Sequence, residues 1–403
     1  MVNLCRTVAI VAGVLVGISC ARSDAPVEWG GTTDTTAGGA IVVANPAEGI
    51  WDAATRWRIV EELRIGTAEG SGPDLFGRVG AIEVDALGRL WVAEAQAQEL
   101  RVFDHAGRHV RTVGREGGGP GEFRQINAVM WGPDGNLWVV DPSNNRVSVI
   151  DTAGNFVTSH PTIGNIVMSP WPGGVDSAGH FYSFAPKPNR ETFAIVLVRH
   201  NAAMEALDTI EVPQRAEPGA GFFEIRSARG FVRASVPYGS GLVWRLVWPG
   251  YIWFGETGDY HLYQRSLAGD TLRIVSKAFE PLPVTSSDID SAIVGLEWFT
   301  RQGGRVDRSR FPAVKPAWQT LYTDDERNLW VVPVLPQEGS RYGVQGFDVF
   351  DPEGRYLGRV TVPFDLAQYP PPLIRGGFLY GVVRDEMEVP YVVRARLERP
   401  DVR

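Results

Sequence analysis

Short runs in which apolar and polar residues alternate recur along the chain from about residue 51 onward. Residues 85–114 read DALGRLWVAEAQAQELRVFDHAGRHVRTVG, and residues 132–157 read GPDGNLWVVDPSNNRVSVIDTAGNFV. In both segments a glycine-containing turn leads into a strand pattern around a tryptophan, and a polar loop leads into a second alternating run that ends in aspartate. Turns of this kind between alternating runs are typical of β-hairpins. Both segments therefore predict antiparallel β-sheet.

The two segments are copies of one unit, because they align at a constant offset of 47 residues, from Leu90 to Leu137 and from Trp91 to Trp138. A unit of about 40–45 residues with four antiparallel strands has the size of one β-propeller blade. Weaker copies lie at residues 175–200, 251–263, 323–355 and 377–397. Together the copies predict an all-β fold, a six-bladed β-propeller that forms one domain over residues 51–403.

A further alternating strand at residues 57–65 precedes the first copy and has no blade of its own. A propeller with an open last blade would expose unpaired backbone groups, which invite aggregation. We therefore predict that residues 57–65 form the outer strand of the sixth blade and close the ring.

One insertion, residues 283–309, has a helical rather than a strand pattern. Residues 286–290 offer a helix N-cap with acids in the first turn, and Gly303-Gly304 ends the run. This pattern predicts a single amphipathic helix packed on the ring. The helix would either act as a lid over one mouth of the channel or cover an exposed blade.

The tryptophans Trp91, Trp138 and Trp330 occupy equivalent positions in the repeat. An aromatic ring for ligand binding is one interpretation of this recurrence. Packing is the better one, because every contact between blades needs a bulky side chain.

The motifs GGGPGEF (residues 117–123), DGNLWV (134–139), NRVSVID (145–151) and TAGNF (152–156) resemble NHL repeats. More closely, the chain resembles bacterial six-bladed β-propeller lipoproteins that are built from such repeats. The resemblance implies the fold. It does not pass on one function, because these proteins have various functions.

The first twenty residues, MVNLCRTVAIVAGVLVGISC, have the pattern of a bacterial secretion signal, with an apolar run too short to span a membrane. Their end, Gly17-Ile18-Ser19-Cys20, resembles a lipobox, in which Cys20 becomes lipid-modified. Ordinary signal-peptide cleavage is the alternative. Residues 21–50 predict a flexible tether in which only residues 40–44 have a strand pattern. We thus expect an exported protein of the bacterial cell envelope, lipid-anchored to a membrane or periplasmic.

The net charge of −8, from 39 Lys and Arg against 47 Asp and Glu, argues against a nucleic-acid partner. The expected partner is a small molecule or a protein of unknown identity, in addition to the membrane.

Carboxylates could hold a metal ion at the channel mouth. Glu94 and Asp141 follow equivalent strands, and Asn144 lies close behind Asp141. Oxygen ligands suit calcium, and calcium-dependent lactonases, another six-bladed family, use such a set. The same side chains could instead cap loops by accepting backbone N–H groups, as they do in NHL repeats without enzymatic activity. Calcium is therefore an alternative, and the main interpretation needs no cofactor.

Several arginines fall in or near segments that we expect to connect blades. They are Arg115, Arg124, Arg226, Arg229, Arg233 and Arg245. Planar guanidinium groups that face a channel would suit carboxylate or sulfated ligands. The sequence shows no serine, histidine and aspartate order typical of a hydrolase.

The function that we predict is non-catalytic binding of a ligand or protein partner on one face of the propeller. The alternative is a calcium-dependent hydrolase or lactonase, or a lyase, that acts at the channel mouth.

Overall fold

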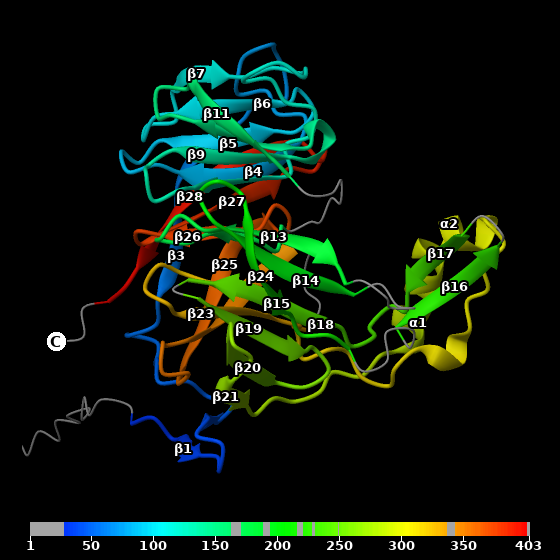
Figure 1. Ribbon diagram of the computed structural model, residues 1–403. Coiled ribbons are helices and arrows are strands. Elements are labelled where there is room, and N and C mark those ends of the chain that lie inside the picture. The colour runs from blue at the N-terminus through cyan, green and yellow to red at the C-terminus, as the bar shows by residue number, and fades with distance from the viewer. Residues whose placement is uncertain are drawn as a thin grey trace, which may run out of the picture.

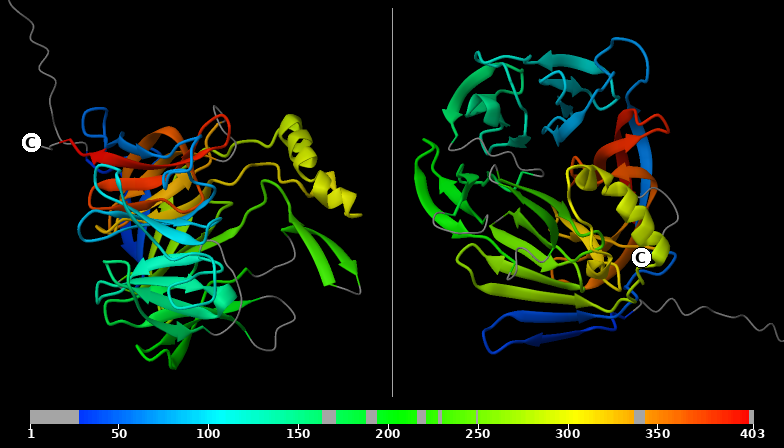
Figure 2. Two further views of the ribbon diagram at one scale, coloured as in Figure 1. Left: turned by 90° about the horizontal axis from the view of Figure 1, so that it is seen from above. Right: turned by 90° about the vertical axis from the view of Figure 1, so that its right-hand side faces the viewer.

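The computed structural model describes residues 28–162, 171–187, 194–215, 221–227, 230–248, 250–336 and 343–400. Its antiparallel sheets surround a central axis, and the right panel of Figure 2 shows them as a ring (Figures 1 and 2). The prediction of an all-β, six-bladed β-propeller is confirmed.

The first half of the ring contains three blades of four strands each. Blade 1 contains β4 (Val79–Val84), β5 (Leu90–Glu94), β6 (Glu99–Phe103) and β7 (His109–Val113). Blade 2 contains β8 (Ala128–Trp131), β9 (Leu137–Asp141), β10 (Arg146–Ile150) and β11 (Phe156–Pro161). Blade 3 contains β12 (Gly174–Val175), β13 (Phe181–Pro186), β14 (Ile195–His200) and β15 (Ala206–Glu211).

The second half of the ring ends with the strand that closes it. Blade 4 contains β18 (Leu242–Val247), β19 (Tyr251–Glu256), β20 (His261–Ser266) and β21 (Thr271–Lys277). Blade 5 contains β22 (Trp318–Thr323), β23 (Leu329–Pro333), β24 (Gly343–Phe350) and β25 (Tyr356–Ala367). Blade 6 contains β26 (Leu373–Arg375), β27 (Phe378–Arg384), β28 (Pro390–Glu398) and β3 (Arg58–Ile65). Because β3 pairs antiparallel with β28 from Arg58 to Ile65, the predicted closing strand is confirmed.

The core consists of apolar side chains between neighbouring blades. Strands β5, β9 and β23 are buried at every position, because each has a blade on both of its faces. Trp91 of blade 1 packs with Leu137 and Val139 of blade 2, and Trp330 of blade 5 packs with Leu379 of blade 6. The packing role that we predicted for the repeated tryptophans therefore holds.

In four blades of the described structure, an aspartate in a tight turn accepts a hydrogen bond from an aromatic side chain six positions later. In blade 1 a carboxylate oxygen of Asp85 accepts the indole N–H of Trp91 at 3.1 Å. Three other blades have the same bond, in the pairs Asp176 and Tyr182, Asp324 and Trp330, and Asp385 and Tyr391. The turn precedes the second strand in blades 1, 3 and 5, and the third strand, β28, in blade 6. Blade 2 has Gly132 at this position, and the indole nitrogen of Trp138 has no hydrogen-bond partner within the described structure.

The N-terminal segment departs from the predicted tether. Strands β1 (Thr32–Thr35) and β2 (Ile41–Asn45) form a hairpin, and β2 adds to the outer edge of blade 4 in parallel with β21. Val43 is buried in the core between blades 4 and 5. The prediction of a flexible tether over residues 21–50 is therefore wrong for β1, whereas β2 agrees with the strand pattern at residues 40–44 and covers a blade edge. Residues 21–27 lie outside the described part of the chain.

After the hairpin, the same segment bonds to blade 5 and then enters blade 6. Asn45 accepts the backbone N–H of Tyr356 at 2.7 Å, and Trp51 donates its backbone N–H to Leu357 at 2.7 Å. The chain then continues into β3. One N-terminal segment thus ties the outer edges of three consecutive blades together.

Two insertions form a small module outside the ring (Figures 1 and 2). The hairpin of β16 (Phe222–Ser227) and β17 (Gly230–Ser235) lies between blades 3 and 4 in the sequence. The helices α1 (Ser286–Gly295) and α2 (Glu297–Arg301) and the short 3₁₀ helix η2 (Arg308–Arg310) lie between blades 4 and 5.

This module corrects the prediction of one helix packed on the ring. The helical segment breaks at Leu296, and its apolar side chains, Phe299 among them, pack against Phe223 and Ala234 of the hairpin. The apolar face of the helices is buried against this hairpin rather than against a blade.

A group of buried charges joins blades 4 and 5 away from the axis. The fully buried carboxylate of Asp348 lies 2.7 Å from the Arg359 guanidinium and 3.4 Å from the Lys277 ammonium. It also accepts the hydroxyl groups of Tyr260 at 2.8 Å and Tyr356 at 2.9 Å. Every carboxylate oxygen therefore has charged and neutral donors.

Candidate functional site

Two neighbouring cavities occupy the axis of the ring, where the inner strands of the blades meet. The first, of 350 Å³, is lined by β4, β8, β12 and β26 of blades 1, 2, 3 and 6. The second, of 480 Å³, is lined by β18 and β22 of blades 4 and 5. Trp171, Tyr369 and Pro371 line both cavities, so the two share a wall. All six blades therefore contribute to one axial site.

Four aromatic residues line each of the two cavities, and Trp171 and Tyr369 are common to both. Trp131 and Trp248 line the first cavity, and Trp244 and Tyr322 line the second. Cavities of about 300–1,000 Å³ with mostly apolar walls and a few polar groups are typical of sites for small organic molecules.

Arg245 is the charged residue of the second cavity. It lies in the middle of β18, whose sequence is LVWRLV. Its guanidinium donates hydrogen bonds to the carbonyl oxygen of Trp244 at 2.8 Å and to the Thr320 hydroxyl of blade 5 at 2.9 Å. Burial lowers the pKa of Arg245, because the surrounding protein disfavours the charged form.

No carboxylate within the described structure forms an ion pair with Arg245. The ionisable side chain beside it is Tyr322, and burial raises the pKa of this phenol to about 12, although the Arg245 charge opposes the shift. Tyr322 is therefore neutral at pH 7, and its hydroxyl donates to the Gln368 carbonyl at 3.4 Å. The positive charge of Arg245 is thus not neutralised by its neighbours.

The first cavity contains an ion pair, in which one positive and one negative side chain compensate each other. The Glu83 carboxylate of blade 1 lies 3.0 Å from the Arg375 guanidinium of blade 6. Burial raises the pKa of Glu83, and the Arg375 charge partly offsets that shift. Among the described residues that line the two cavities, Arg245 is therefore the one cation without a carboxylate partner.

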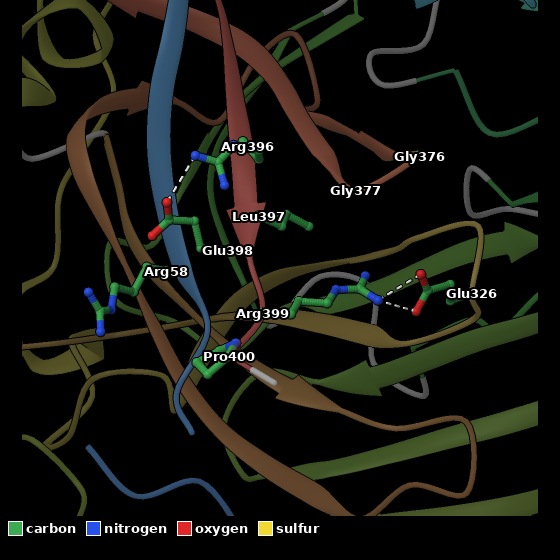
Figure 3. A pocket seen from close by; sticks show the side chains of 9 residues that line it. All are labelled: Arg58, Glu326, Gly376, Gly377, Arg396, Leu397, Glu398, Arg399 and Pro400. Atoms are coloured by element: carbon green, nitrogen blue, oxygen red, sulfur yellow. Dashed lines mark hydrogen bonds and ion pairs between the residues drawn. The ribbon is translucent and has the colours of Figure 1, made fainter. Parts of the chain in front are cut away.

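A third, more open hollow of 720 Å³ lies at the rim between blades 5 and 6 (Figure 3). Two of its arginines have acidic partners: Arg399 lies 2.6 Å from Glu326, and Arg396 lies 2.9 Å from Glu398. Arg399 also stacks over Trp57, with 4.1 Å between its guanidinium carbon and the ring centroid. The paired charges and the open shape make this hollow a weaker candidate than the axial site.

The sequence-predicted arginines are distributed over the molecule, and Arg245 is the member of the set that lines the axial cavities. Arg115 is exposed on the connection between blades 1 and 2, 2.7 Å from Glu122. Arg226 and Arg233 both pair with Glu224 on the outer module. Arg229 lies outside the described residues. Arg115, Arg226 and Arg233 do not form one site with Arg245.

Arg124 and Asn144 lie near each other beside the glycine loop that joins blades 1 and 2. The amide of Asn144 donates to the Gly117 carbonyl at 2.9 Å and to the Asp141 carboxylate at 2.6 Å. Both side chains thus belong to an inter-blade connection and not to the cavity wall.

Glu94 and Asp141 have equivalent structural surroundings. The buried Glu94 carboxylate accepts the backbone N–H of Gly77 at 2.8 Å and of Arg78 at 3.1 Å. Asp141, also buried, accepts the backbone N–H of Gln125 at 2.9 Å. Both carboxylates therefore cap the connection that enters their blade. In the described part of the chain, no three His, Cys, Asp or Glu side chains are grouped closely enough to hold a metal ion.

Residues 1–20, including Cys20, lie outside the described part of the chain. Within that part, no helix is both long and apolar enough to cross a membrane.

The sequence reasoning missed the aromatic walls of the site, because Trp171, Trp244 and Tyr369 lie where the repeat is least regular. One signal was present. Arg245 interrupts a strand in which every other residue is apolar, and a charge at such a place needs a partner or a function.

Comparison with known proteins supports the fold. The model of the family DUF5128, described as a 6-bladed beta-propeller, matches residues 72–160. A crystal structure of a Bacteroides fragilis protein, named as a candidate exported protein, is 11% identical, with 89% of this chain and 99% of that chain covered and a TM-score of 0.50.

Two other solved structures are more distant in shape. A DUF4221 family member from Bacteroides vulgatus is 11% identical, covers 86% of this chain and 99% of its own, and has a TM-score of 0.47. Virginiamycin B lyase from Staphylococcus aureus is also 11% identical, covers 85% of this chain and 100% of its own, and has a TM-score of 0.44. No curated protein matches the sequence. At these identities the likeness concerns the fold alone.

Proposed function

We propose that this protein is an exported propeller, anchored to a membrane through a lipid on Cys20, that binds a small organic molecule in its axial channel without transforming it. The observation that carries the proposal is the pair of adjoining cavities, which are lined by aromatic side chains from the inner strands of the ring. Inner strands from all six blades line these cavities, so a bound ligand would contact side chains from several blades.

The composition of the walls supports binding rather than catalysis. The described lining residues include no histidine, cysteine, serine or aspartate, and their one glutamate, Glu83, is paired with Arg375. A general base or a nucleophile is most often such a side chain, and the raised pKa of Tyr322 makes its phenol a poor base at pH 7. The alternative with calcium and hydrolysis has no equivalent support in the axial site.

Obstruction of the channel tests the proposal. Gln319 is exposed and lines the second cavity, so Gln319→Trp should fill this cavity without disturbing the core. Thermal shift and calorimetric titration with a panel of small aromatic compounds should show binding to the wild type that this variant loses. The control Gln302→Trp, on the exposed surface after α2, should bind as the wild type does. Binding that survives Gln319→Trp would disprove the axial site.

Two further measurements address the rest of the proposal. Replacement of Cys20 by Ser should move the protein from the membrane fraction to the soluble fraction of the producing bacterium. A panel of lactones and esters, assayed with and without added calcium, should show no turnover. Turnover that depends on calcium would favour the enzymatic alternative.

A further inference from the structure

We infer that Arg245 is the anion-binding residue of the axial site and that the ligand is a small monocarboxylate with a flat, apolar body. The inference rests on the proposed function, since it names the chemical class of the molecule that the channel binds.

The hydrogen bonds of Arg245 leave donors available to a ligand. A guanidinium has five N–H donors in a planar fork. Within the described structure two hydrogen bonds are formed, to the Trp244 carbonyl and to the Thr320 hydroxyl. Arg245 also keeps partial exposure to the cavity. A carboxylate matches the fork of the remaining donors, because its two oxygens can accept a pair of parallel hydrogen bonds.

The charge of the site favours a single negative charge. Glu83 and Arg375 compensate each other at 3.0 Å, and Tyr322 is neutral at pH 7, so that Arg245 is the one described lining residue whose charge has no anionic partner. A partly buried charge without a partner is unfavourable in a protein. A ligand carboxylate would remove this cost, and a second negative charge on the ligand would have no matching cation.

The residues that line the cavity beside Arg245 indicate the shape and polarity of the ligand outside its carboxylate group. Trp244 precedes Arg245 in β18, and Trp171, Tyr322 and Tyr369 complete the aromatic lining of the 480 Å³ cavity. Aromatic walls of this kind favour flat apolar groups, which they contact over a large area. The site therefore combines one cation, Arg245, which would bind a carboxylate, with aromatic walls that would bind a planar apolar group.

A matched pair of probes tests the inference directly. Naphthalene-2-carboxylate and naphthalene-2-carboxamide have nearly the same shape and differ in charge. Titration calorimetry should show that the wild type binds the carboxylate about tenfold or more tightly than the amide, as expected for a hydrogen-bonded charge pair. Arg245→Met should abolish this preference and keep the affinity for the amide.

Control variants separate this inference from the proposed function. Arg273→Met removes a guanidinium from the outer strand of the same blade, and should leave both affinities unchanged. Gln319→Trp should weaken binding of both probes. Arg245→Lys should retain a part of the preference, since it keeps the charge and loses the fork.

The possible results distinguish a failure of this inference from a failure of the proposed function. If the wild type binds both probes equally, or if Arg245→Met keeps the preference for the carboxylate, the inference is wrong although the channel still binds ligands. If the wild type binds neither probe at about 1 mM, the weak end of specific binding, both the inference and the proposed function are contradicted.

Discussion

The interface between blades 4 and 5 contains one fully buried charged group, Asp348, and one partly buried charged group, Arg245, whose charges are compensated differently. Away from the axis, Asp348 has two cations and two tyrosine hydroxyls around it. At the axis, Arg245 has a hydroxyl and a backbone carbonyl, and no carboxylate in the described structure pairs with it. Both groups lose hydration on folding, and only one regains an opposite charge from the protein.

This difference separates a structural charge from one that awaits a ligand. A buried charge that the fold itself compensates contributes to the stability of the interface once its partners are in place. A charge in a cavity without such compensation decreases stability and increases the affinity for an anion. We therefore expect substitution of Asp348 to lower the stability of the protein, and substitution of Arg245 to lower mainly its affinity for an anion.

The largest effect is expected at Asp348. Its replacement by Ala leaves Lys277 and Arg359 without their common partner at a buried position. We expect the free energy of unfolding to fall by about 3–5 kcal/mol, as for other buried ion pairs that lose one member. Urea unfolding followed by tryptophan fluorescence measures this change. A loss below about 1 kcal/mol would contradict the structural role of Asp348.

The contribution of Asp348 should also depend on pH. Burial by itself raises the pKa of this carboxyl, but the hydrogen bond from Arg359 and the charges of Lys277 and Arg359 outweigh it, so that the pKa lies below its usual value. A lowered pKa in the folded state means that the stabilisation is complete above the unfolded pKa of about 3.9 and is lost as the pH falls through the folded pKa. The difference in stability between the wild type and Asp348→Ala should therefore be constant from neutral pH to about pH 5 and shrink below about pH 4. A difference that shrinks already near pH 6 would mean that the pKa is raised.

A smaller loss is expected at Asp141, whose carboxylate is compensated by backbone N–H groups rather than by cations. Asp141→Ala leaves the buried N–H of Gln125 and the amide of Asn144 without this acceptor. We expect a loss of about 1–3 kcal/mol in the free energy of unfolding. Calcium should not change the melting temperature of either protein. A calcium-dependent increase in the wild type that Asp141→Ala loses would favour the metal alternative.

The smallest change in stability is expected at Arg245. Arg245→Met removes a charge without a carboxylate partner, and we expect the free energy of unfolding to stay within about 1 kcal/mol of the wild type or to rise. Lys277→Met is the matched comparison, because it removes a cation that pairs with Asp348, and it should be more destabilising. A large loss in Arg245→Met, equal to that of Lys277→Met, would mean that Arg245 is structural.

The regular parts of the fold could be predicted because their pattern is local. The turn aspartate, the aromatic residue six positions later and the glycine turns follow one another within a single blade, so the sequences of blades 1 and 5 contain the complete signal, and blade 2 lacks the aspartate. The closing strand was predictable as well, because an alternating segment without a blade has few places to pair. The tryptophans could be assigned to packing for the same reason, since equivalent positions meet equivalent neighbours.

The parts that could not be predicted depend on contacts between distant segments. Residues 41–45 have a short strand pattern, but only the free edge of blade 4 turns them into a parallel strand. The helical insertion is amphipathic in its sequence, and its partner is another insertion, more than fifty residues earlier, that has no repeat pattern. Similarly, Glu94 and Asp141 look like metal ligands until the backbone N–H groups that they accept are known.

The type of unit, its repetition and the strand that closes the ring can be read from the local pattern, because they follow from hydrophobic period, turn residues and the need to cover an open edge. Which charges are compensated and which side chains meet at the axis depends on contacts between distant segments. Compensation depends on distances of a few ångströms between residues far apart in the chain, as between Lys277 and Asp348. The same physical reason made Arg245 one of six similar arginines in the sequence and the one uncompensated cation of the axial cavities in the described structure.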